Sequence, residues 1–208
     1  MPQETLMNDK APAGTAQRAY NDLHEHIAAL DEAGLLTTID EPINKDTEMH
    51  PLVRWQFRGG IPEPERKAFL FNNVTDSRGR KYDIPVVVGA LAANPEIYRI
   101  GMGVDALDQI GPRWDHALGN PVQPTVVETA PVQEIVLQGD EVQGEGKGLD
   151  ALPIPISTPG FDVAPYFTAA TWITKDPDDG VQNMGVYRGN LKAPDRVAVM
   201  MLITPVSY

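Results

Sequence analysis

The chain has 208 residues, of which 42% are hydrophobic and 22% charged, an ordinary composition for a globular protein. Its net charge of -12 and pI near 4.6 argue against nucleic-acid binding, which needs a basic face, and against binding to anionic membranes. The absence of cysteine excludes disulfides, thiolate nucleophiles and zinc–thiolate sites.

The first segment of the chain is predicted to be a disordered arm. Residues 1–19 are largely polar and show no apolar period. They lack the basic end and apolar centre of a signal peptide, and no apolar run in the chain is long enough to span a bilayer. We therefore expect a cytoplasmic protein without a membrane partner.

Residues 20–115 are predicted to alternate between helices and strands. Asp22 and Glu25 form a capping-box pattern at the start of a helix that Gly34 would end, and a strand is expected over residues 35–39. Thr47 is the expected cap of a second helix, which would end at residues 59–60.

Two further strands and a third helix complete this first part. The strands are expected over residues 68–71 and 84–89, and the helix begins at Asn94-Pro95. This alternation predicts a small α/β domain. We place a domain boundary near residues 111–120.

The remainder, residues 116–208, is predicted to be mainly β. It is rich in Val, Ile, Thr and Pro, with turn signals at residues 139–148, 176–180 and 193–195. Strands are expected over residues 132–138, 167–174, 184–190 and 197–204. Regularly spaced strands with little helix favour a barrel or a sandwich.

Several familiar catalytic and metal-binding patterns are absent. The four histidines show no metal-ligand spacing, and no serine lies in a nucleophile elbow. Residues 139–148 lack the Lys-Ser/Thr ending of a phosphate loop and are interpreted as a solvated turn. Residues 175–180 lack the spacing of a calcium-binding loop and are interpreted as a hairpin turn.

Residues 182–188 carry the side chains best suited to chemistry. The amide oxygen of Asn183 suits Mg²⁺ or Mn²⁺, and the guanidinium of Arg188 suits a carboxylate. Gly185 would let a cofactor approach the backbone. On an unbroken strand the side chains of Asn183 and Arg188 would emerge on opposite faces. Taken alone, the spacing in this segment favours a plain hairpin strand with a surface arginine over a functional site.

The chain resembles the UbiD family in collinear order from about residue 20 to about residue 200. The stretches that carry the resemblance are residues 22–27, 34–36, 39–43, 68–74, 130–137, 152–155, 162–168 and 182–188. The resemblance implies an α+β fold. A small N-terminal α/β domain would precede part of a flavin-reductase-like split β-barrel.

The resemblance also implies an activity. UbiD enzymes are carboxy-lyases that decarboxylate, or in reverse carboxylate, aromatic, heteroaromatic or α,β-unsaturated carboxylic acids. They use prenylated FMN with Mn²⁺ (or Mg²⁺) and K⁺, which bridge the flavin phosphate to the protein. A prenyl-flavin synthase would supply the cofactor. Residues 192–196 resemble family members that act on aromatic or heteroaromatic acids.

The family's functional residues can be carried over onto matching positions. Asn183 would ligate the divalent metal, and the backbone carbonyl of Met184 would bind K⁺. Arg188 would belong to the catalytic Glu-Arg-Glu network and orient the substrate carboxylate. The remaining residues of the flavin site would be Thr168, Gly185, Val186 and Tyr187.

The chain also departs from the family. Family chains are much longer, and their metal-binding His and Glu and their two catalytic glutamates lie beyond the part matched here. We therefore expect a truncated chain that is inactive alone, and either a homo-oligomer or a complex with a complementing chain. The alternative is a non-catalytic subunit or interaction module that retains the UbiD fold.

Overall fold

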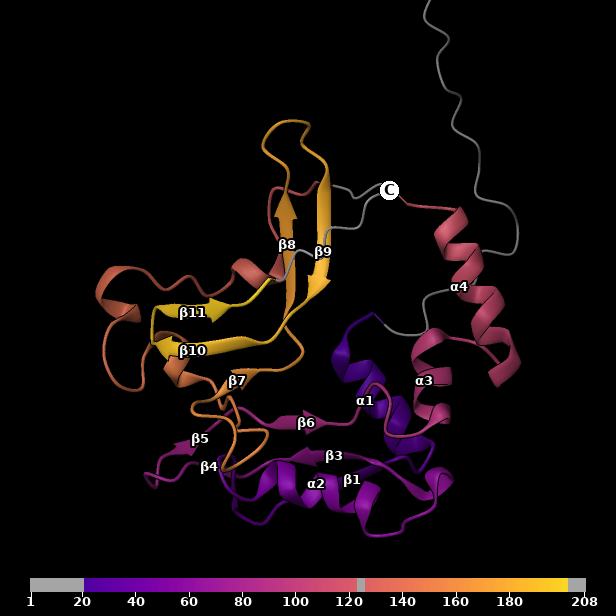
Figure 1. Cartoon of the computed structure of the whole chain (residues 1–208), viewed down its shortest axis with the longest axis horizontal. Coiled ribbons are helices and arrows are strands. Elements are labelled where there is room, and N and C mark those ends of the chain that lie inside the picture. Colours follow the sequence, from indigo (N-terminus) through magenta and orange to yellow (C-terminus); the bar gives the residue numbers. More distant parts are fainter. Residues whose placement is uncertain (1–20, 123–125, 202–208) are drawn as a thin grey trace, which may run out of the picture.

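The computed structural model describes residues 21–122 and 126–201 (Figure 1). The arm expected over residues 1–19 lies outside the described residues, as does the end of the strand expected over residues 197–204. Among the helices that are described, none is long and apolar enough to cross a membrane.

Helix α1 (Leu23–Glu32) begins and ends as its sequence predicts. Asp22 is the N-cap, and its carboxylate accepts a hydrogen bond from the backbone N–H of Glu25. Gly34 follows the helix with a φ of 70°, a left-handed conformation that glycine adopts at little cost. The predicted capping box is half correct, because the carboxylate of Glu25 accepts from Asn21 instead of Asp22.

The N-terminal part is built around a three-stranded sheet in the order β1-β3-β6. Strand β1 (Leu36–Ile39) runs parallel to β3 (Ala68–Phe71), which is antiparallel to β6 (Val86–Val88). The strands expected over residues 35–39, 68–71 and 84–89 are therefore confirmed in position, within a residue or two at each end.

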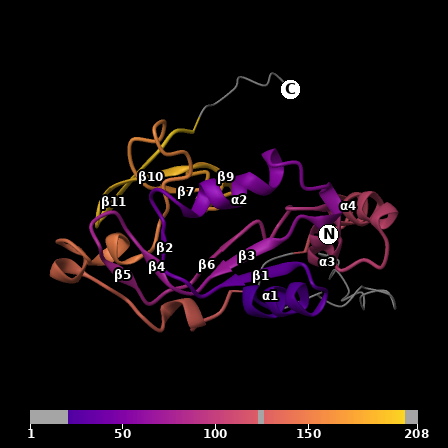
Figure 2. The ribbon, with the colours of Figure 1, turned by 90° about the horizontal axis from the view of Figure 1, so that it is seen from below.

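Helices cover both faces of this sheet (Figure 2). Helix α2 (Met49–Arg58) packs on one face, where Met49 and Val53 are buried against Phe71. Helices α1 and α3 (Pro95–Met102) pack on the other face, where Leu30 and Ile97 are buried against Ala68. Side chains on opposite faces of β3 thus pack into two separate hydrophobic cores, as the two-residue period of a strand requires.

The starts of helices α2 and α3 differ in how well the sequence predicts them. Asn94 caps α3 through a hydrogen bond to Ile97, as expected. The expected cap Thr47 is wrong, because α2 begins at Met49 with Glu48 in the cap position and no side-chain cap bond. The carboxylate of Glu48 instead accepts from the backbone of Asn44, which holds the preceding residues in a turn.

A second sheet and a fourth helix complete the N-terminal half. Strands β2 (Ile43–Asn44), β4 (Val74–Thr75) and β5 (Lys81–Tyr82) form a small sheet in that order. Helix α4 (Ile110–Gly119) spans the segment where the domain boundary was placed, near residues 111–120. The boundary itself stays a prediction.

The C-terminal half contains one small sheet and one hairpin. Strands β7 (Tyr166–Phe167), β10 (Gly189–Ala193) and β11 (Arg196–Val199) form an antiparallel sheet in the order β11-β10-β7. Strands β8 (Thr171–Lys175) and β9 (Gln182–Val186) form a hairpin that projects beyond it (Figure 1). The turn predicted over residues 176–180 closes this hairpin.

The predicted strands of this half need two corrections. Residues 132–138 form no strand; a single 3-10 turn, Pro131–Gln133, lies there, because Pro131 favours a first helical turn and Gln133 closes it onto Ala130. The strands expected over residues 167–174 and 184–190 are each broken, so four short strands replace two long ones.

The mixture of helices and sheets confirms the α+β class. Strands over residues 21–122 and 126–201 form no closed barrel, and the split β-barrel stays a prediction.

Candidate functional site

Arg188 lies at the break between β9 and β10, and its guanidinium is held on two sides. Nη2 lies 3.0 Å from each carboxylate oxygen of Asp162. The guanidinium carbon lies 4.1 Å from the ring centroid of Tyr166, in cation–π contact. The side chain of Asp162 is 11% exposed and that of Arg188 is 49% exposed. The guanidinium is therefore oriented but still open to solvent.

The strand register brings Thr168 to the same place. Strand β10 pairs with β7 so that Gly189 lies opposite Phe167. Arg188 and Thr168 are the next residues outward on the two strands, so they lie at the same end of the ladder. Two of the site residues implied by the UbiD resemblance are thus close in the fold, although twenty residues apart in sequence.

Asn183 and Met184 lie farther along the hairpin. Asn183 pairs with Thr174, near the closing turn, while Arg188 follows the other end of β9. An extended strand rises about 3.3 Å per residue, so β9 carries the chain about 10 Å from Asn183 to Val186. Asn183 therefore lies near the closing turn and Arg188 lies beyond the other end of β9, so the two residues do not form one cluster.

The side chains between them are partly exposed. Met184 and Val186 are 69% and 68% exposed and occupy one face of the hairpin. On the other face, a side chain at Gly185 would collide with the ring of Tyr187. The carbonyl of Tyr187 accepts a hydrogen bond from the indole of Trp172, which fixes the break after β9. Strand β9 and the following Tyr187 thus form one exposed surface, the β9 wall, in which Tyr187 fills the space beside Gly185.

The described residues do not by themselves fit a protein-bound metal. The amide oxygen of Asn183 accepts from the backbone N–H of Met184. In residues 21–122 and 126–201, no three His, Asp or Glu side chains lie close enough together to hold an ion. A divalent ion at Asn183 would need most of its ligands from a phosphate and from other groups.

Helix α2 of the N-terminal half contributes to the surroundings of Arg188. Arg54 donates through Nη2 to the carbonyl of Ser157 at 3.0 Å and to the hydroxyl of Thr158 at 2.9 Å. His50, one turn earlier on α2, is partly buried, and its Nε2 has no hydrogen-bond partner in the described structure. Burial and the charge of Arg54 lower the pKa of His50.

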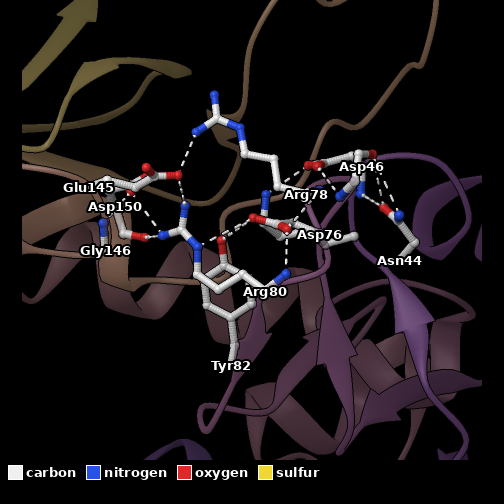
Figure 3. A network of polar contacts seen from close by, with 11 residues as sticks. Asn44, Asp46, Asp76, Arg78, Arg80, Tyr82, Glu145, Gly146 and Asp150 are labelled. Carbon is white, nitrogen blue, oxygen red and sulfur yellow. Dashed lines mark hydrogen bonds and ion pairs between the residues drawn. The ribbon is translucent and has the colours of Figure 1, made fainter.

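A separate cleft of about 590 Å³, partly lined by charged side chains, lies between the two halves of the chain, next to β4 and β5. Arg80 joins the two sides, because Nη1 donates to Asp150 at 2.8 Å while Nε lies 3.5 Å from Asp76 (Figure 3). Asp76 also accepts from the hydroxyl of Tyr82. The loop predicted as a solvated turn, residues 139–148, is thus pinned to the N-terminal half near its end.

These contacts control the ionisation of the side chains in the cleft. Burial acts to raise the pKa of both Asp76 and Asp150, but hydrogen bonds and the charge of Arg80 outweigh it and hold both pKa values below the usual range. Burial and the nearby Asp76 raise the pKa of Tyr82. The cleft therefore holds ionised, mutually compensating pairs.

Comparison with known protein families settles the membership of the chain. A UbiD model described as "3-octaprenyl-4-hydroxybenzoate carboxy-lyase N-terminal domain" matches residues 27–114. A second UbiD model, the "Rift-related domain" of the same carboxy-lyase, matches residues 125–207. The chain belongs to the UbiD family. The resemblance seen in the sequence is confirmed.

Solved structures of UbiD-class enzymes have the same fold. HmfF from Pelotomaculum thermopropionicum in complex with FMN is 30% identical, with a TM-score of 0.70 over 86% of this chain and 36% of that chain. An evolved dimeric form of HmfF in complex with prFMN is also 30% identical, with a TM-score of 0.71 over 86% of this chain and 38% of that chain.

Another UbiD-class neighbour is the apo 3,4-dihydroxybenzoic acid decarboxylase from Enterobacter cloacae. It is 26% identical, with a TM-score of 0.71 over 88% of this chain and 37% of that chain. The present chain thus spans little more than a third of the length of these UbiD-class relatives.

Three residues beside Arg188 received no role from the sequence. Asp162 lies within a stretch that resembles the family, but its contact with Arg188 spans 26 residues and has no local signal. His50 and Arg54 did leave a signal, since residues four apart on a helix share one face. Their shared face points at the loop that holds Asp162.

Proposed function

We propose that this chain contributes the flavin wall and the carboxylate-binding arginine of a prenylated-FMN-dependent carboxy-lyase. The substrate would be an aromatic, heteroaromatic or α,β-unsaturated carboxylic acid, decarboxylated or, in reverse, carboxylated. The observation that carries the proposal is Arg188, oriented by Asp162 and Tyr166 yet 49% exposed at the end of the β7–β10 ladder.

Arg188 would bind the substrate carboxylate. Both contacts to Asp162 are made by Nη2, and an arginine has further N–H donors on its other nitrogens. A planar guanidinium that is already oriented loses little entropy when it donates to a second carboxylate. These hydrogen bonds would hold the carboxylate in position while the carbon–carboxyl bond breaks.

The layout of β9 supports a flavin mononucleotide as the cofactor. This molecule is elongated, with its ring at one end and its phosphate at the other. Arg188 and Thr168 at one end of the wall would border the ring and the substrate. Asn183 and the carbonyl of Met184, at the other end, would meet the phosphate through Mn²⁺ (or Mg²⁺) and K⁺. When bound, the prenylated flavin supplies the electron sink for the carbanion.

The FMN and prFMN complexes of HmfF support the choice of cofactor. The Enterobacter enzyme supports an aromatic acid as the substrate. We further propose that a prenyl-flavin synthase supplies the cofactor and that the protein acts in the cytoplasm. We extend the proposal also to assembly, either as a homo-oligomer or with a complementing chain, and a complementing chain would provide further ligands and acid–base groups.

A second function has one observation in its favour. Because no cluster of acidic or histidine side chains lies around Asn183 in the described residues, the chain also fits a non-catalytic subunit that retains the UbiD fold. The two functions differ in what a carboxylic acid does to bound flavin.

The test is reconstitution of the chain with prenylated FMN, Mn²⁺ and K⁺, alone and with the part of a relative such as HmfF that this chain does not match. Aromatic and unsaturated acids are then added. We expect a shift in flavin absorbance, and CO₂ release in the complemented mixture that falls about 100-fold in Arg188→Gln. Flavin binding without any response to acids would favour the non-catalytic subunit, and equal CO₂ release by Arg188→Gln would contradict the role of Arg188.

A further inference from the structure

We propose that Asp162 is the positioning residue for Arg188, and that helix α2 fixes Asp162 from the N-terminal half through Arg54. The inference rests on the proposed function, because it takes Arg188 as the carboxylate-binding group. It adds a residue outside the β9 wall and a structural connection between the two halves of the chain.

The Asp162–Arg188 pair has the geometry of an orienting contact. One nitrogen of the guanidinium, Nη2, is shared by both carboxylate oxygens at 3.0 Å. Tyr166 lies against the flat face at 4.1 Å. An edge and a face of the guanidinium are therefore fixed, and its remaining donors are left for a ligand.

Asp162 is itself held in place by a closed turn. Its carboxylate accepts from the backbone N–H of Thr158 at 2.9 Å, and its own backbone N–H donates to the carbonyl of Thr158 at 2.9 Å. The backbone N–H of Phe161 donates to the same carbonyl at 3.0 Å. These bonds hold the carboxylate on the side that faces Arg188, where only 11% of the side chain is exposed.

Helix α2 attaches this turn to the core of the N-terminal half. Arg54 binds the carbonyl of Ser157 and the hydroxyl of Thr158, at 3.0 and 2.9 Å. The adjacent Val53 is 4% exposed and packs in the core against the sheet. A displacement of α2 would thus move the turn and, with it, the carboxylate that orients Arg188.

The alternative role for Asp162 makes the opposite prediction. If Asp162 merely occupied Arg188 and competed with the substrate carboxylate, its removal would free the arginine and tighten binding. If Asp162 positions Arg188, its removal leaves a mobile guanidinium and weakens binding, because ordering then costs entropy on every binding event.

The first experiment needs no flavin. We would record the guanidinium ¹⁵N resonances of Arg188 in the whole chain by NMR, for wild type, Asp162→Asn, Asp162→Glu and Arg54→Lys. Asparagine keeps an oxygen for the Thr158 N–H and removes the charge. The control is Asp178→Asn, which removes the same charge from the exposed turn of the β8–β9 hairpin.

We expect separate, slowly exchanging Nη resonances of Arg188 in wild type and in the control. These resonances should merge in Asp162→Asn and partly merge in Arg54→Lys. In Asp162→Glu, which keeps the charge, they should be partly separate. Circular dichroism and Tm identify any variant that fails to fold. Unchanged Arg188 resonances in folded Asp162→Asn would overturn the positioning role, and unchanged resonances in folded Arg54→Lys would overturn the part of α2.

The second experiment is a titration of the FMN-loaded chain with benzoate. We expect Asp162→Asn to weaken binding about tenfold, which corresponds to 1.4 kcal/mol. Tighter binding would overturn the proposal in favour of competition. If wild type binds no benzoate, the proposed function fails, and the NMR comparison still decides the role of Asp162.

Discussion

Single side chains around Arg188 determine what the candidate site can bind. The sequence identifies Arg188, Asn183 and Thr168 through a family resemblance, and the structure adds their arrangement. Arg188 and Thr168 meet at one end of a ladder, whereas Asn183 lies near the far end of β9. Spacing alone could not show this, because the strand expected over residues 184–190 is broken at Tyr187 and Arg188.

His50 is the residue whose ionisation reports on this region. Burial, followed by the charges of Arg54 and Arg188, lowers the pKa of His50 below its usual value of about 6.5, although Asp162 acts in the other direction. The folded state therefore favours neutral His50. Its contribution to stability is complete above pH of about 6.5 and is lost as the pH falls through the lower, folded-state pKa.

The prediction is that His50→Gln removes this pH dependence from the free energy of unfolding, measured by denaturant titration. His24→Gln is the control, because the side chain of His24 is 95% exposed. An NMR titration should place the pKa of His50 below its usual value of about 6.5, and lower still in Asp162→Asn. A wild-type His50 that titrates at or above pH 6.5 would contradict the account.

At the scale of elements, local patterns predict the N-terminal half better than the C-terminal half. The expected strand over residues 68–71 and the Asn94 cap of α3 are confirmed, because alternation and capping are local. The strand expected over residues 132–138 is wrong, although it is rich in Val and Ile. A strand needs a partner, and a sequence pattern does not show where that partner lies.

Strand β10 begins at Gly189, where there is no room for a side chain. A methyl group at Gly189 would lie 2.8 Å from Val197 and 3.1 Å from the ring of Trp172. We predict that Gly189→Ala lowers the free energy of unfolding by about 1–3 kcal/mol, because the strand or the indole must shift. The matched control is Gly119→Ala, the last residue of helix α4, where nothing lies within 4 Å.

The control variant should be neutral or stabilising by up to about 1 kcal/mol, since alanine favours a helix. Chemical denaturation of both variants checks the prediction. Equal stability of Gly189→Ala and wild type would show that β10 does not pack on Trp172 as described.

At the scale of the whole molecule, ion pairs around Arg80 connect the two halves of the chain (Figure 3). The turn at residues 139–148 was predicted, but not its attachment next to β4 and β5 through Glu145 and the following Asp150, because Arg80 and Asp150 lie 70 positions apart. We predict that Asp150→Asn lowers the free energy of unfolding by about 1–2 kcal/mol, as Asp150 accepts from both Arg80 and Gly146.

Hydrogen–deuterium exchange should then accelerate over residues 144–150. The control is Glu145→Gln, since Glu145 is 69% exposed and its pairs with Arg78 and Arg80 should contribute about 0–1 kcal/mol. Because the pKa values of Asp76 and Asp150 are lowered, the contribution of these two carboxylates to stability is complete above pH of about 4 and is lost in more acidic solution. Equal exchange in Asp150→Asn and wild type would contradict the attachment.

The central claim is that β9 forms one wall of a flavin site, with Asn183 at its phosphate end. The most direct measurement is titration of the chain with FMN and with riboflavin, which lacks the phosphate, each with and without Mn²⁺. We predict saturable binding of one FMN per chain that Mn²⁺ strengthens, and no effect of Mn²⁺ on riboflavin or on FMN binding by Asn183→Ala. No saturable FMN binding, or the same effect of Mn²⁺ on both flavins, would contradict the account.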